Sequence, residues 1–98
     1  MLLTVTLDSL MGRGSIAGAL GDVPAAGRAL AEARALGEDA TDELLLDLEC
    51  SCTLAALAAG DPAPARALLQ RCRELESAPE ARRWIQRQVW RLERALAL

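Results

Sequence analysis

The chain has 98 residues and a net charge of −3, which suits one small domain with a single modest core. It has no His, Lys, Tyr or Phe, and its richness in Ala, Leu, Arg and Glu predicts an all-α fold. Without His, Ser- and Cys-based triads lack their usual base, and without a C-x-x-C motif a zinc site is not expected. We therefore expect a protein that is not an enzyme and holds no cofactor or metal ion.

The first 21 residues raise the question of a phosphate-binding loop. Residues 2–7 alternate apolar side chains with Thr, and Gly12, Gly14, Gly18 and Gly21 follow closely. A dinucleotide site needs further parallel strands, and no later segment has a strand pattern. We predict a helix over 3–20, in which Gly14 and Gly18 allow close helix packing, although the segment LLTVT is poor helix material.

Two later stretches are copies of each other. Residues 17–37 and 56–76 align without gaps at an offset of 39, with eight identities in 21 positions. The shared turns predict that Gly21 and Gly60 end one helix with positive φ, and that Asp22 and Asp61 cap the next. We therefore predict helices over 23–36 and 62–76. Their apolar stripes comprise Ala26, Leu30, Ala33 and Leu36 in the first copy, and Ala65, Leu69, Cys72 and Leu75 in the second.

Between these copies lies a predicted helix over 40–59. Gly37 ends the preceding helix, and either Asp39 or Thr41 caps this one. It begins acidic and then becomes apolar on most sides, so we expect it to be covered on both flanks. Its acids suggest a carboxylate metal site, but the helix dipole favours an acidic first turn and explains most of them. They are Asp39, Asp42, Glu43, Asp47 and Glu49. The cysteines Cys50, Cys52 and Cys72 are expected to be reduced and mostly buried.

A last helix is predicted over 79–97. The sequence SAPE at 77–80 is typical of a capping box in which Ser77 caps and Glu80 reaches back. Ile85, Val89, Leu92 and Leu96 form its apolar stripe, and Arg83, Arg87, Trp90 and Arg94 lie on the opposite face. Basic residues beside an aromatic ring can bind nucleic acid. The acidic pI of about 4.9 and the lack of a helix-turn-helix pattern favour a protein contact.

The pattern resembles the tetratricopeptide repeat, in which a Gly-Asp turn is followed by Ala, a large apolar residue and Ala. Gly21, Ala26, Leu30 and Ala33 match in the first copy; Gly60, Ala65 and Leu69 match in the second, with Cys72 replacing the last Ala. The usual Trp and Tyr of the first helix are absent, and the 39-residue period is similar to that of degenerate repeats in large bacterial transcription activators. The resemblance implies an α-solenoid with repeat 1 over about 3–37, repeat 2 over about 40–76 and an extra helix over about 79–97.

The resemblance also implies a non-catalytic, cytoplasmic protein–protein interaction module of the kind that forms part of bacterial regulatory proteins. The alternatives are a ligand- or peptide-sensing domain and, less favoured, nucleic-acid contact through the last helix. The first helices of such repeats line the concave surface. The implied partner-binding residues are Asp47, Cys50, Leu54, Leu57, Gln86, Val89, Trp90 and Glu93.

The unequal distribution of charge bears on self-association. Residues 1–61 carry a net charge of −7 and residues 62–98 a net charge of +4. The next Gly-Asp turn would fall at 99–100, so the last helix lacks the partner that a third repeat would supply. We expect either a homodimer through residues 84–98 or a truncated longer chain, and the charge pattern also permits a head-to-tail contact. No segment predicts a membrane span.

Overall fold

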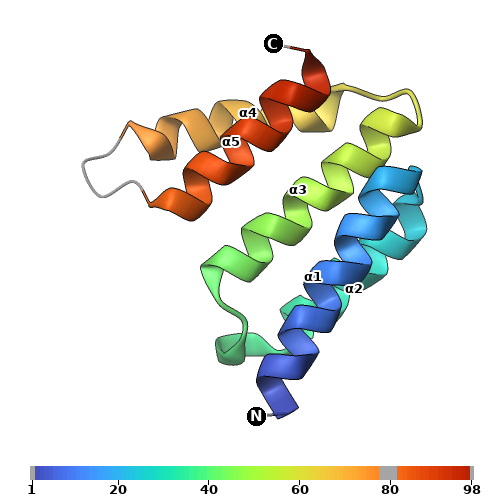
Figure 1. Cartoon of the computed structure of the whole chain (residues 1–98), viewed down its shortest axis with the longest axis vertical. Helices are drawn as coiled ribbons and strands as arrows, with labels where there is room; N and C mark the ends of the chain where they lie inside the picture. The colour runs from blue at the N-terminus through green and yellow to red at the C-terminus, as the bar shows by residue number, and fades with distance from the viewer. Residues whose placement is uncertain (1, 78–81, 98) are drawn as a thin grey trace.

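The structure is a computed structural model that describes residues 2–77 and 82–97, and these residues form an all-helical domain (Figure 1). Its five α-helices follow the predicted order, and one short 3₁₀ helix lies between the second and the third. They are α1 (Leu2–Leu20), α2 (Val23–Ala35), η1 (Gly37–Asp39), α3 (Asp42–Ala58), α4 (Ala63–Glu76) and α5 (Arg83–Leu96). The predicted all-α class is confirmed.

Helix α3 lies at the centre of the arrangement. Helices α1 and α5 flank it on the face shown in Figure 1, while α2 lies behind α1 and α4 behind α5. The pairs in contact agree with this view, because α3 packs against each of the other four helices. The resulting body is thin, measuring 38 × 35 × 16 Å along its principal axes.

Glycine determines where two helices end. Gly21 has φ of 72° and Gly60 has φ of 102°, as their predicted role in the turns requires. After the first turn, the Asp22 carboxylate accepts a hydrogen bond from the backbone N–H of Ala25 at 3.1 Å, so Asp22 caps α2 as predicted.

The structure corrects the predicted cap of α4 and decides between the two candidate caps of α3. Asp61 accepts from the N–H of Ala63 at 3.2 Å, but Pro62 is the residue that flanks α4, so the acid lies one position before the cap. Of the two candidate caps for α3, the hydroxyl of Thr41 accepts from the N–H of Leu44 at 3.1 Å. Asp39 instead ends the 3₁₀ helix η1, which the sequence did not predict.

The predicted capping role of Ser77 is wrong. Its hydroxyl donates to the carbonyl oxygen of Glu74 at 2.8 Å, so Ser77 closes the end of α4. Helix α5 begins at Arg83, after an extended Arg82, and not at position 79. The other members of the expected box, Pro79 and Glu80, lie outside the described residues.

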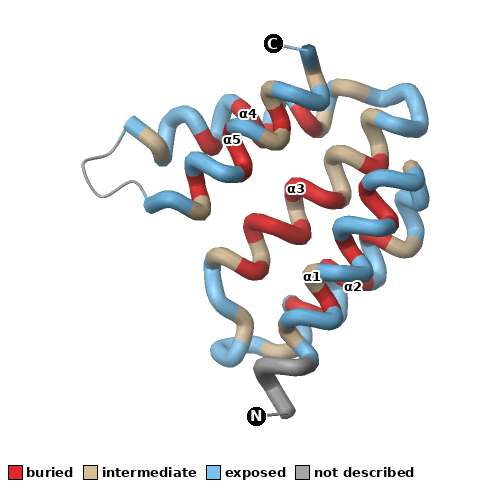
Figure 2. The backbone as a smooth tube through the Cα atoms, viewed as in Figure 1, coloured by how far each residue is buried: buried red, intermediate tan, exposed pale blue. Residues whose placement is uncertain are grey.

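Buried residues recur along most of α3 (Figure 2). The C-terminal cluster joins α3, α4 and α5 through Leu46, Cys50, Ala65, Leu68, Leu69, Cys72, Ile85, Val89 and Leu92. The N-terminal cluster joins α1, α2 and α3 through Leu10, Ala29, Leu30, Ala33, Leu44 and Leu48, and a small contact of Ala17, Ala26 and Ala55 adjoins the same three helices. The prediction that α3 is covered on both flanks is confirmed.

The predicted stripes are buried except at their C-terminal ends, where Leu36 and Leu96 are half-buried and Leu75 is exposed. Leu75 in the last turn of α4 is 51% exposed, because it borders an open hollow of about 350 Å³ between α3, α4 and α5. No helix in the described part of the chain is long and apolar enough to cross a bilayer.

Candidate functional site

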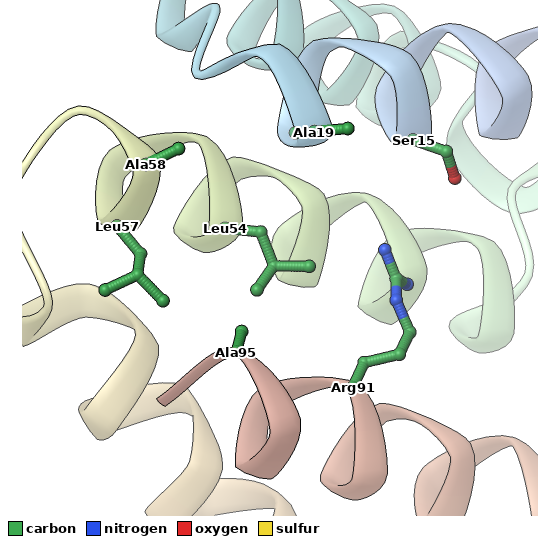
Figure 3. Close-up of a pocket in the computed structure, with 8 residues that line it drawn as sticks. Ser15, Ala19, Leu54, Leu57, Ala58, Arg91 and Ala95 are labelled. Carbon is green, nitrogen blue, oxygen red and sulfur yellow. The ribbon is translucent and has the colours of Figure 1, made fainter. Parts of the chain in front are cut away.

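A groove runs between α1, α3 and α5 on the face shown in Figure 1, and Figure 3 gives a close-up of it. Its volume is about 480 Å³, within the range of roughly 300–1,000 Å³ that is usual for ligand sites. The lining consists of Ser15, Gly18, Ala19, Leu54, Leu57, Ala58, Arg91 and Ala95. The groove is open to solvent and mostly apolar, with a hydroxyl and a guanidinium as its polar side chains.

Two glycines let α1 approach the wall of this groove closely. A Cβ atom added to Gly14 would lie 2.5 Å from Cδ2 of Leu48, and one added to Gly18 would lie 3.0 Å from the backbone oxygen of Ser51. A side chain at position 14 would have to displace the Leu48 side chain, and one at position 18 would have to displace the backbone of α3. The predicted role of both glycines in close packing is confirmed. Helix α1 is continuous through them, which removes the phosphate-loop interpretation.

A buried polar network joins α3 to α5 at the edge of the groove. Arg91 Nη1 donates to Oδ2 of Asp47 at 3.1 Å and to Oε1 of Gln88 at 2.7 Å. Arg91 Nη2 donates to the hydroxyl of Ser51 at 3.3 Å, and Gln88 Nε2 donates to the same Asp47 oxygen at 3.2 Å. Since three groups hold the guanidinium, Arg91 presents a fixed donor surface to the groove (Figure 3).

Sequence reasoning named Asp47 but missed Ser51, Gln88 and Arg91. Asp47 and Ser51 are four residues apart on α3, and Gln88 and Arg91 are three apart on α5, so each pair shares a face of its helix. That spacing was the available signal. The second oxygen of Asp47, Oδ1, is buried and has no hydrogen-bond partner within the part of the chain that the structure describes.

The eight residues expected to bind a partner do not form one surface. Leu54 and Leu57 line the groove, whereas Cys50 and Val89 are buried in the C-terminal cluster and cannot reach a partner. The expectation for those two is corrected, because an α3 that is apolar nearly all round does not reveal which side faces outward. Asp47 belongs to the buried network, and the remaining three are Gln86, Trp90 and Glu93 on α5.

These three residues on α5 lie outside the groove. Glu93 forms an ion pair with Arg73 of α4 at 2.9 Å. Gln86 and Trp90 border a separate hollow of about 340 Å³ together with Arg83 and Arg87. Trp90 is 67% exposed, which is unusual for the largest apolar side chain in proteins.

The outward side of α5 is strongly basic. We call Arg83, Arg87, Trp90 and Arg94 the basic face of α5, and all four side chains are exposed. Arg87 lies 3.9 Å from a carboxylate oxygen of Glu43 on α3. Arg83 and Arg94 make no ion pair with any residue in the ranges 2–77 and 82–97.

The three cysteines carry free thiols, and burial dominates their acidity. Desolvation raises the pKa of Cys50 to about 12, an effect that Arg91 partly offsets and that Asp47 and Cys72 reinforce. Burial also raises the pKa of Cys52 and of Cys72. The thiols are therefore protonated at neutral pH and do not have the lowered pKa of a nucleophilic cysteine.

The acidic residues of α3 are the remaining candidates for a metal site. In the described ranges, no group of three or more Cys, Asp or Glu side chains is arranged to hold a metal ion. Asp42 and Glu43 occupy the first turn of α3, Asp47 is bound by Arg91, and Glu49 pairs with Arg71 at 3.1 Å.

Comparisons with protein-family models, with curated proteins and with solved structures gave no match.

Proposed function

We propose that this chain is a non-catalytic protein–protein interaction module that binds a segment of its partner in the groove between α1, α3 and α5. The observation that carries this proposal is the lining of the groove, in which small and aliphatic side chains surround the fixed guanidinium of Arg91. Such a lining suits a short peptide that presents apolar side chains and a nearby hydrogen-bond acceptor.

The order of the helices supports the same proposal. Helices α1, α3 and α5 lie together on one face, with α2 and α4 behind them, as tetratricopeptide-like hairpins would place their first and second helices. We propose that the two Gly-Asp turns mark two such repeats and that α5 takes the place of a first helix beside them. In this arrangement the groove corresponds to the concave surface of the repeats.

A small-molecule sensor is the rival proposal, and the groove gives it less support. Sites for small molecules enclose most of the ligand and aim several polar groups at it. Here the groove is open, and Ser15 and Arg91 are its polar lining side chains. Most of the network's polar atoms bind each other.

Selection from a displayed random-peptide library tests this proposal. Peptides selected on the wild-type chain should bind Ala19→Arg and Ala95→Arg about tenfold more weakly or worse, since each arginine fills part of the groove. Ala31→Arg is the matched control, because Ala31 is exposed on α2 and does not line the groove. A library that yields no binder, or binders equally tight on all four proteins, would contradict the proposal.

A further inference from the structure

We propose that the basic face of α5 binds the acidic edge of a second copy of this chain, so that two copies form a closed two-fold dimer. The acidic edge comprises Glu38 and Asp39 in η1 and Asp42 at the start of α3. None of the residues in these two surfaces lines the groove. The proposal is therefore independent of the function proposed above, and either can fail without the other.

The basic face has the composition of a protein contact. It combines three guanidinium groups with an indole ring that is 67% exposed, and Trp and Arg are the side chains most enriched at the centre of protein interfaces. The hollow of about 340 Å³ beside Trp90 is lined by Arg83, Gln86 and Arg87 as well, and none of the described residues that line it is acidic. An acidic surface is the complementary partner.

The acidic edge supplies that partner within the same chain. Glu38, Asp39 and Asp42 are exposed, and they form no ion pair with other residues described in the structure. Asp42 is followed by Glu43, the residue that approaches Arg87 at 3.9 Å. The two charged surfaces therefore adjoin on one molecule, which allows a single two-fold axis to place each acidic edge on the basic face of the other copy.

The charges argue against direct pairing of two α5 helices. In such a dimer the basic faces would meet, and Arg83, Arg87 and Arg94 of one copy would confront the same guanidinium groups of the other. Like charges in contact are strongly unfavourable, whereas the reciprocal contact pairs opposite charges twice. The net charge of −3 on each copy is spread over the molecule, and salt at physiological strength screens it beyond about 8 Å.

Two charge-reversal variants test the contact. Arg83→Glu/Arg94→Glu reverses the basic face, and Glu38→Arg/Asp39→Arg reverses the acidic edge. None of these four side chains has an ion pair with another described residue, so their reversal breaks no such pair within one copy. We expect sedimentation to show a wild-type dimer at about 50 µM, and each variant to raise the dissociation constant about tenfold or more. An equimolar mixture of the two variants should dimerise again, because the swapped charges attract.

Three measurements complete the test. Far-UV circular dichroism checks that each variant remains folded. Arg28→Glu/Arg66→Glu makes the same charge change on α2 and α4 and should leave the dimer intact. A monomeric wild-type chain, variants that still dimerise, or a mixture that stays monomeric would overturn the proposal. Binding of single-stranded DNA to a monomeric wild-type chain would assign the basic face to nucleic acid instead.

Discussion

Asp47 shows how one buried charge joins two helices. The residue is only 6% exposed, and its carboxylate accepts hydrogen bonds from both Arg91 and Gln88 of α5. A buried carboxylate is tolerated only when such partners replace water. Removing it would leave the guanidinium and the amide without their shared acceptor, so its contribution should differ sharply from that of a surface acid.

Truncation of this residue should be strongly destabilising. We expect Asp47→Ala to lower the free energy of unfolding by about 2–4 kcal/mol, because Arg91 loses its ionic partner in a largely buried site. Glu43→Ala is the matched control, since Glu43 also links α3 to α5 through an arginine, but at 3.9 Å and on the surface. Its loss should amount to at most about 1 kcal/mol. Equal effects in urea unfolding would show that burial of the pair has no energetic role.

Among the elements, α1 depends most on small side chains. Its glycines differ in surroundings: a Cβ on Gly18 would meet the backbone of Ser51, while one on Gly12 would meet nothing within 4 Å. The close approach at Gly18 also forms one wall of the groove. Backbone cannot rotate aside as a side chain can, so the contact between α1 and α3 should be sensitive to a single methyl group.

This contrast predicts opposite outcomes for two identical substitutions. Gly12→Ala should stabilise the chain by up to about 1 kcal/mol, because it reduces the freedom of the unfolded chain within an exposed helical position. Gly18→Ala gains the same helix propensity but must displace α3, so we expect it to be about 1–3 kcal/mol less stable than Gly12→Ala. Thermal unfolding of the two variants measures the difference, and equal melting temperatures would contradict the packing described for α1.

The helices were largely predictable because the residues next to each helix end determine where it ends. Gly21 and Gly60 adopt positive φ, and Asp22 caps α2, since each of these choices depends on neighbouring residues alone. Ser77 was misjudged because the same hydroxyl can cap the next helix or close the previous one. The sequence around it does not distinguish these possibilities, whereas the packing of α4 does.

The candidate site was less predictable than the helices, because the sequence does not indicate how α3 is rotated about its own axis. Helix α3 is apolar on most sides, so its sequence does not indicate which residues face α4 and which face the groove. Leu54 and Leu57 line the groove, whereas Cys50 is buried in the C-terminal cluster, and a partner-binding role for the two leucines stays a prediction. The network around Arg91 depends on contacts between residues 40 or more positions apart, which local spacing cannot reveal.

At the scale of the whole molecule, α3 is shared by two hydrophobic clusters. The C-terminal cluster binds it to α4 and α5, and the N-terminal cluster binds it to α1 and α2. The helices α1 and α2 on one side, and α4 and α5 on the other, therefore share buried contacts with α3 and not with each other's cluster. A change in α3 affects both clusters, whereas a change in an outer helix affects one.

The buried thiols have a consequence for the stability of the whole chain in alkaline solution. The sequence has no Lys, His or Tyr, and Arg stays charged, so the cysteines are the side chains that titrate between about pH 7 and 12. Burial raises the pKa of Cys50 from 9.0 to about 12, so the folded chain keeps protons that the unfolded chain releases. This contribution is fully present below pH 9 and is lost as the pH rises towards 12.

Urea unfolding at a series of pH values should therefore give a flat profile near neutrality and a decline at alkaline pH. The decline should approach about 1.4 kcal/mol per pH unit for each thiol that stays protonated only in the folded state. Cys50→Ala should lessen the slope by about one such proton, whatever its effect on stability at pH 7. A profile that stays flat to about pH 11 would mean that the thiols are not held away from water. Because so few groups titrate in this range, the loss of stability at alkaline pH measures how far the folded chain shields its cysteine thiols from water.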